Sequence, residues 1–159
     1  METRSSTNPA AGASFADRLA GRNEDVILLA GRLALGIIFV KSGIQKLLAL
    51  SAFAASLAGR GVPNSETWAV IGATVEFVGG VLLVTGLKTR YASLLLILFV
   101  IVATGIAHRY WDFVEAAARR TQEIQFFKNL SILGGLLLIF VTGSGRFGLD
   151  AILRRRKGN

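Results

Sequence analysis

Four long apolar stretches dominate the chain, and short polar or charged segments separate them. The stretches lie at about residues 26–50, 67–87, 91–109 and 124–143. As helices rising 1.5 Å per residue, stretches of about 19–25 residues are long enough to cross a bilayer core of about 30 Å. The third is the strongest, because Tyr91–Ala107 contains no charged residue. The pattern therefore predicts an all-α protein, an integral membrane four-helix bundle.

The segments at the two ends of the chain are polar. Residues 1–25 are rich in Ser, Thr, Asn, Ala and Gly, which predicts a flexible N-terminal tail, although Ser14–Asp25 could form a short surface helix. Residues 26–150 are then a single four-span domain, since no internal repeat divides them. The last residues, 151–159, form a basic tail that contains Arg154–Lys157.

The composition fits a membrane protein and excludes several other classes. Of the 159 residues, 52% are hydrophobic and only 18% are charged, against about 25% in an average soluble domain. With no cysteine, the chain can form neither a disulfide framework nor a Cys-ligated zinc or iron–sulfur site. One histidine and an initiator methionine are too few for a typical two-ligand haem, and no nucleotide or metal motif is present.

The positive charge of the chain predicts its orientation. The net charge is +8, but the basic residues are not interleaved with aromatic ones, so we do not expect nucleic-acid binding. The N-terminal tail, the second connection and the C-terminal tail together hold ten Lys and Arg residues, whereas the first and third connections hold four. The positive-inside rule then places both termini in the cytoplasm, with the basic tail near anionic lipid headgroups.

A few charged residues lie within the apolar stretches, where a charge costs at least about 2.5–3.5 kcal/mol at the bilayer centre. Glu76 is the one acid, and at 1.5 Å per residue it lies about 13–14 Å below the outer end of its helix. Lys41 is about as deep, while Lys46 and Lys128 lie at about 6 Å. Because lysine side chains are long, Lys46 and Lys128 can also reach Glu76. Four more polar residues share the shallower level: Gln45, His108, Gln125 and Asn129.

Small and polar residues recur at steps of three and four on each predicted helix, which gives each helix one face suited to close packing. Lys41 is turned about 140° from Lys46 around the first helix, so we expect Lys46 to face the bundle axis and Lys41 to face lipid or a partner. The residues that we expect at helix contacts are Arg32, Gly36, Gly43, Gly79, Gly80 and Gly135.

The polar groups of the outer half permit two interpretations. They form a satisfied buried network that fixes helix packing, or they form a site for a quinone headgroup or a small anionic substrate. In the second, the lysines stabilise negative charge, the glutamate pairs with them, and the histidine, whose ordinary pKa is near neutrality, relays a proton. The candidate site residues are Gln45, Lys46, Glu76, His108, Lys128 and Asn129.

Several short motifs, taken in order over residues 26–150, resemble those of the DoxX family. They are Arg32-Leu33-Ala34-Leu35-Gly36 with Ser42-Gly43-x-x-Lys46-Leu47, Glu76-Phe77-Val78-Gly79-Gly80 with Gly86-Leu87, His108 with Trp111, and Phe126-Phe127-Lys128-Asn129-Leu130 with Gly134-Gly135. The resemblance implies a four-span bacterial inner-membrane protein. It further implies a membrane subunit of a quinone-linked redox complex that handles sulfur compounds or thiol and oxidative stress, with a soluble or membrane oxidoreductase as its partner.

Two other functions stay open on the residues alone. The chain could be a non-catalytic membrane scaffold or assembly protein, in which the polar groups only hold helices together. It could also be a small-anion transporter, which would require a homo-oligomer because four spans are few for one chain and no inverted repeat is evident. A bound quinone is the one cofactor that the sequence leaves open.

Overall fold

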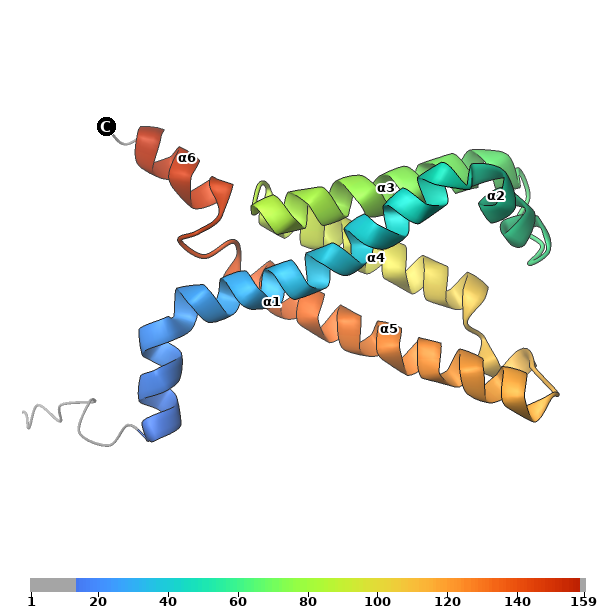
Figure 1. Cartoon of the computed structure of the whole chain (residues 1–159), viewed down its shortest axis with the longest axis horizontal. Helices are drawn as coiled ribbons and strands as arrows, with labels where there is room; N and C mark the ends of the chain where they lie inside the picture. The colour runs from blue at the N-terminus through green and yellow to red at the C-terminus, as the bar shows by residue number, and fades with distance from the viewer. Residues whose placement is uncertain (1–13, 158–159) are drawn as a thin grey trace, which may run out of the picture.

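The computed structural model describes residues 14–157, and this range contains helices and no strand. The predicted flexibility of residues 1–13 lies outside the described residues. In chain order the helices are α1 (Phe15–Leu48), α2 (Leu50–Ala58), α3 (Ser65–Thr85), α4 (Thr89–Ala107), the short 3-10 helix η2 (Tyr110–Asp112), α5 (Ala116–Thr142) and α6 (Leu149–Lys157) (Figure 1). Helices α1, α3, α4 (with η2) and α5 are long and apolar enough to cross a membrane. The prediction of an all-α fold with four candidate spans is therefore confirmed.

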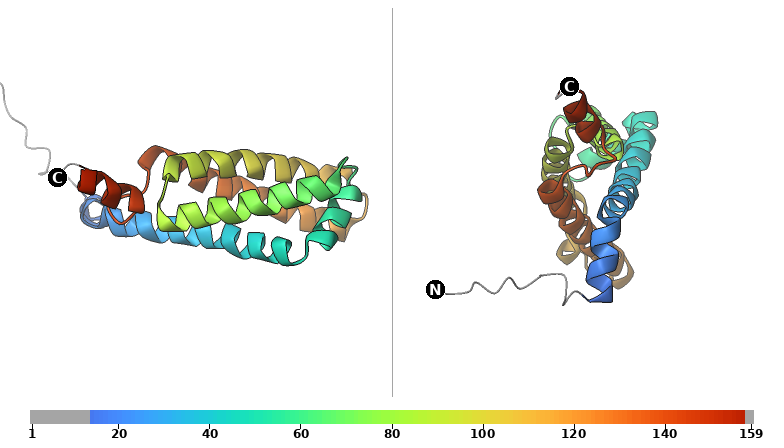
Figure 2. Two further views of the ribbon diagram at one scale, coloured as in Figure 1. Left: turned by 90° about the horizontal axis from the view of Figure 1, so that it is seen from above. Right: turned by 90° about the vertical axis from the view of Figure 1, so that its left-hand side faces the viewer.

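The four long helices lie side by side along the long axis of the molecule (Figure 2). Helix α1 packs along α3, α3 along α4 and α4 along α5, while α1 and α5 touch at few points. Figure 1 shows why, because α1 and α5 cross and then diverge towards α2. We call the end that carries α2 and η2 the α2 end, and the opposite end, which carries α6 and the start of α1, the α6 end.

Two helices begin earlier than the hydrophobic pattern predicts, because polar residues cap them. Ser14 and Asp17 form a capping box at the start of α1, so residues 15–25 are helical and not part of a flexible tail. The Glu115 carboxylate accepts hydrogen bonds from the backbone N–H groups of Ala117 and Ala118 at the start of α5. These bonds hold the pKa of Glu115 below its ordinary value. Capping thus adds polar turns that hydropathy does not detect.

The two short helices α2 and α6 were not predicted as separate elements. Helix α2 follows α1 after a break at Ala49, whose backbone is non-helical. Helix α6 contains most of the segment that the sequence predicts as a basic tail. Its residue Asp150 accepts hydrogen bonds from the backbone N–H groups of Lys88 (2.7 Å) and Thr89 (2.9 Å), so it caps the start of α4 from a distant part of the chain.

Long-range contacts hold the α6 end together. Burial raises the pKa of Asp150, but the hydrogen bonds from the Thr89 and Lys88 backbone outweigh this and leave the pKa below its ordinary value. The buried Arg32 guanidinium donates to the carbonyl oxygen of Ser144, just after α5. Asp25 on α1 accepts from the backbone N–H of Arg146 at 2.8 Å. These bonds place the start of α1 and the segment after α5 at the same end of the bundle.

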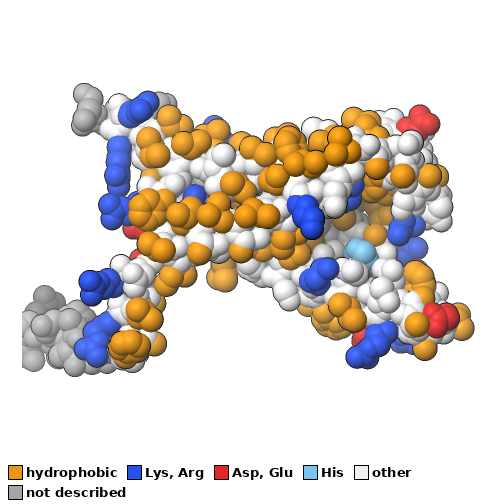
Figure 3. Space-filling view, viewed as in Figure 1, with side chains coloured by type: hydrophobic (Ala, Val, Ile, Leu, Met, Phe, Trp, Pro, Cys, Tyr) orange, Lys and Arg blue, Asp and Glu red, His pale blue; other side chains and the backbone are white. Residues whose placement is uncertain are grey.

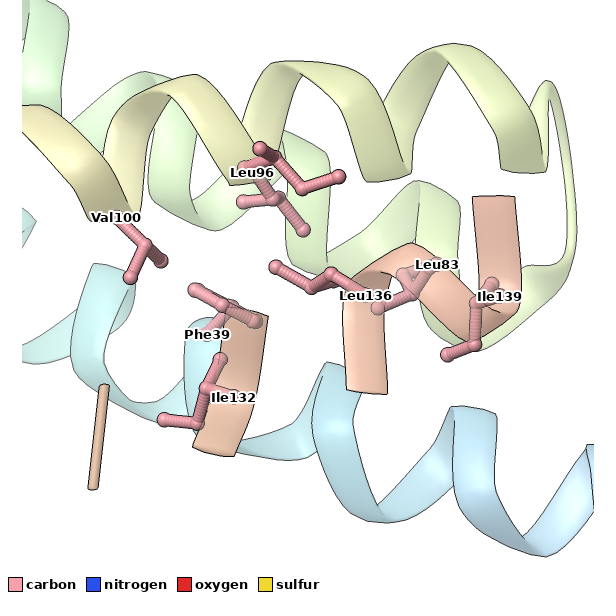
Figure 4. Close-up of a cluster of buried hydrophobic side chains, with 8 residues drawn as sticks. Phe39, Leu83, Leu96, Val100, Ile132, Leu136 and Ile139 are labelled. Carbon is pink, nitrogen blue, oxygen red and sulfur yellow. The ribbon is translucent and has the colours of Figure 1, made fainter. Parts of the chain in front are cut away.

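The core reaches from the α6 end to about the middle of the bundle and is built from all four long helices (Figure 4). Leu83, Leu96 and Leu136 are fully buried there. The remaining members of the cluster are Phe39, Ile97, Val100, Ile132 and Ile139. Large apolar side chains also remain on the outside, such as Leu138 and Val141 at 69% and 70% exposure. Figure 3 shows hydrophobic side chains over the middle of one face and Lys and Arg mostly towards its two ends, as a bilayer requires.

Candidate functional site

The ion pair between Lys46 and Glu76 is the centre of the candidate site. The Lys46 ammonium on α1 contacts the Glu76 carboxylate on α3. The two side chains are not equally buried, since that of Glu76 is 6% exposed and that of Lys46 is 29% exposed. The carboxylate is therefore sealed inside the bundle, while the ammonium stays within reach of molecules outside it. The depths of the residues match Glu76 with Lys41 instead, and the pair with Lys46 depends on the reach of the long lysine side chain.

Two aromatic rings complete the surroundings of the ammonium. The Nζ atom of Lys46 lies 5.2 Å from the centre of the Phe53 ring on α2 and 5.7 Å from that of Phe99 on α4. Both distances are within the range of cation–π attraction. Both rings lie beside Gly72, where a Cβ would be in ordinary van der Waals contact with them, 3.7 Å from Phe53 and 3.8 Å from Phe99. Four helices therefore surround one ammonium.

Sequence reasoning missed Phe53 and Phe99. Phe53 lies on α2, in a segment after residue 50 that the sequence assigned to no helix, and Phe99 lies in the uniformly apolar third stretch. The continuation of the apolar pattern from Leu50 to Ala58 was the available signal for α2. No sequence signal distinguishes Phe99 from its apolar neighbours, because its role depends on where α4 crosses α3.

Of the six predicted site residues, four do not join this cluster: Gln45, His108, Lys128 and Asn129. Lys128 was expected to reach Glu76, but its side chain is exposed and forms no ion pair or hydrogen bond among residues 14–157. Gln45 is also exposed. Gln45 faces away from the cluster because neighbouring residues of a helix are turned by about 100°, and Gln45 directly precedes Lys46. Lys41 is exposed too, as expected from its angular offset.

The other polar residues form separate contacts between α4 and α5. Asn129 donates from its side-chain amide to the Thr104 hydroxyl at 2.8 Å. The Nδ1 atom of His108 lies 2.8 Å from Oε1 of Gln122, so Nδ1–H donates to this amide oxygen. Figure 3 shows the imidazole, which belongs to the one histidine of the chain, on this face towards the α2 end. Neither contact involves Lys46 or Glu76.

The small residues predicted at helix contacts lie where helices meet. A Cβ at Gly43 would lie 2.6 Å from the backbone nitrogen of Phe77, and one at Gly80 would lie 2.8 Å from that of Val40. Helices α1 and α3 thus approach to a backbone-to-backbone contact that only glycine permits. Gly36, Gly79 and Gly135 similarly face Val84, Leu96 and Leu35 on neighbouring helices.

Two cavities lie away from the ion pair. One of about 490 Å³ lies between α2 and the start of α3, where Ser51, Ala55 and Glu66 line it. The other, of about 360 Å³, lies at the α6 end and is lined by basic residues. Neither is lined by Lys46 or Glu76.

Comparison with known proteins identifies the family. Residues 27–109 match the model of the DoxX family. The chain belongs to the DoxX family. Among its relatives, the DoxX chain is 33% identical to inner membrane protein YphA of Escherichia coli (strain K12) over 130 residues, which is 82% of this chain and 92% of YphA. It is 30% identical to inner membrane protein YqjF of the same organism over 133 residues, or 84% of this chain and 96% of YqjF.

A third relative of this DoxX chain comes from another organism. It is the uncharacterized membrane protein Rv3486 of Mycobacterium tuberculosis, 30% identical over 139 residues that cover 79% of this chain and 80% of Rv3486. No solved structure shows significant similarity to the chain. The matched region contains α1 from residue 27 onwards, α2, α3 and α4, and with them the Lys46–Glu76 pair.

Proposed function

We propose that the chain is a multi-pass protein of a bacterial inner membrane, with its α6 end in the cytoplasm. The printed names of YphA and YqjF support the location, because both are inner membrane proteins that match nearly their whole length. The excess of Lys and Arg in the two tails and in the turn around Lys88 supports the orientation.

Because the chain contains no cysteine, single introduced cysteines test this orientation directly. Val114 is fully exposed at the α2 end, and Arg156 is exposed on α6. In intact cells, a thiol reagent that cannot cross membranes should label Val114→Cys and not Arg156→Cys. After the membrane is permeabilised, both should react. Labelling of Arg156→Cys alone in intact cells would show that the orientation is opposite to the one proposed.

Within the membrane, the function proposed for this bundle is that of a subunit of a quinone-linked redox complex, with Lys46 holding the quinone headgroup. The observation that carries it is the ammonium of Lys46, a side chain that is 29% exposed. An ammonium has three N–H donors, and Glu76 takes one of them. The described residues offer no second hydrogen-bond acceptor to it, and the rings of Phe53 and Phe99 provide flat apolar faces beside it.

These residues fit a quinone by their chemistry. A quinone carbonyl can accept a charge-assisted hydrogen bond from the Lys46 ammonium, and its flat ring can lie against the phenylalanine rings. Glu76 holds the ammonium in position. A quinone supplies two-electron, two-proton chemistry when it is bound. Because the chain has no cysteine, a partner oxidoreductase would have to oxidise the sulfur compound or thiol and deliver the electrons.

Quinone binding can be tested by titrating a short-chain ubiquinone into the purified full chain in mild detergent. Quenching of the two tryptophans reports binding, and mass spectrometry of the native preparation reports any co-purifying oxidoreductase. In Lys46→Met/Glu76→Leu, which removes both charges, the dissociation constant should rise at least about tenfold, because a hydrogen bond to a charged group contributes about 1.5–3 kcal/mol.

Lys41→Met is the matched control for this experiment. It removes a lysine from the same helix whose side chain is exposed, so its affinity for the quinone should not change. Equal binding by the folded double variant and the wild-type chain would contradict the quinone role. It would favour the second candidate function, a non-catalytic scaffold.

The scaffold function has its own supporting observation. Lys46 with Glu76, Asn129 with Thr104 and His108 with Gln122 each satisfy polar groups between different helices or at helix ends. Such pairs hold helices in register without any ligand. For a scaffold, substitutions at these pairs would lower stability while leaving the redox activity of the partner complex unchanged per folded molecule.

A further inference from the structure

The cavity of about 360 Å³ at the α6 end has an unusual lining. Three basic residues line it. Lys88 lies just before α4, Arg90 lies in the first turn of α4, and Arg154 lies on α6. The volume lies at the lower end of the range for small-molecule sites. The cavity is therefore large enough for a compact polar group, and its charge favours an anion.

The single acid of the lining does not cancel this charge. Both oxygens of Asp150 already accept backbone hydrogen bonds, Oδ1 from Lys88 and Oδ2 from Thr89. Asp150 thus belongs to the cap of α4. Three basic residues and one acid leave a net positive lining, and the side chains of Lys88 and Arg154 donate no hydrogen bond to the described protein. Their N–H donors are available to a ligand.

The position of the cavity indicates where such a ligand comes from. Helix α4 is a candidate span that starts at Thr89, so Lys88 and Arg90 lie at the membrane–water boundary. Tyr91 also lines the cavity and is 74% exposed, as expected for an aromatic residue at the interface. On α6, Ile152 and Leu153 are 42% and 46% exposed beside the basic residues. An amphipathic helix of this kind lies in the headgroup layer.

We propose that this cavity binds the phosphate of an anionic phospholipid headgroup, with Lys88, Arg90 and Arg154 as its ligands. The acyl chains then extend along the apolar surface beside Tyr91. Basic pockets at the end of a transmembrane bundle bind anionic headgroups, because each Lys or Arg near the membrane surface adds about 1 kcal/mol of attraction. The site requires only that the bundle spans a bilayer, and it is independent of the quinone proposal.

The full chain in an uncharged detergent allows a direct test by native mass spectrometry and lipid titration. The probes are phosphatidylglycerol, phosphatidylcholine and inorganic phosphate. We expect one phosphatidylglycerol molecule to stay bound per chain under conditions that remove phosphatidylcholine. In Lys88→Gln/Arg154→Gln the dissociation constant for phosphatidylglycerol should rise at least about tenfold, and thermal unfolding should show that this variant is folded.

The matched control is Arg155→Gln/Arg156→Gln. It also removes two positive charges, but from exposed residues of α6 that do not line the cavity, so its affinity should change less than about twofold. If both double variants lost the same affinity for phosphatidylglycerol, the lipid would be held by general charge attraction and not by this cavity. Equal retention of phosphatidylcholine, or complete displacement of the lipid by inorganic phosphate, would overturn the specificity for an anionic lipid.

Discussion

Lys46→Met should destabilise the bundle far more than Glu76→Leu does, although both break the same ion pair. The lysine variant leaves the Glu76 carboxylate in a place where only 6% of its side chain is exposed. An uncompensated buried charge of this kind costs about 3–5 kcal/mol. The glutamate variant leaves the lysine, whose side chain is 29% exposed and can turn its ammonium towards water, at a cost of about 1 kcal/mol.

The measurement is the free energy of unfolding in mixed detergent micelles, followed by circular dichroism. The double variant Lys46→Met/Glu76→Leu should recover most of the loss, because neither charge then remains in the bundle. Lys41→Met, an exposed lysine on the same helix, should change stability by less than about 0.5 kcal/mol. If the two single variants lost the same free energy of unfolding, the different burial of the two side chains would not explain the energetics of the ion pair.

Gly43→Ala is the second substitution for which we expect a large effect. The added Cβ would lie 2.6 Å from the backbone nitrogen and 2.7 Å from the Cα of Phe77, and backbone atoms cannot move aside as a side chain tip can. Helices α1 and α3 must separate, which costs about 1–3 kcal/mol for overpacking. Because Gly43 lies one turn before Lys46, the separation should also pull the ammonium away from Glu76.

Gly134→Ala provides the comparison for this prediction. Nothing lies within 4 Å of a Cβ at Gly134 on α5, so the substitution should stabilise the helix by about 0.5–1 kcal/mol through its higher helix propensity. The same unfolding measurement serves both variants. If Gly43→Ala were as harmless as Gly134→Ala, the close approach of α1 and α3 would not contribute to stability.

Depth alone matches Glu76 with Lys41, and only the expectation that Lys46 faces the bundle axis points to the pair that forms. The same reach was expected of Lys128, which forms no such pair among the described residues. Residue numbers give the height of a side chain along a straight helix well, because each residue adds 1.5 Å. They give its direction only relative to other residues of the same helix. Helix α1 packs closely on α3, whereas α5 diverges from α1, and no pattern within either helix contains that information.

The sequence alone determined the parts of this DoxX protein that depend on solvent and local geometry. Lipid and water accept different side chains, and this preference explains the lengths of the apolar stretches and the excess of basic residues in the tails. The absence of cysteine is read directly from the residues. The small residues also predicted which faces pack closely. The tertiary structure alone decided which groups meet. The rings of Phe53 and Phe99 surround Lys46, and Asp150 caps α4, because helices distant in sequence cross at those points.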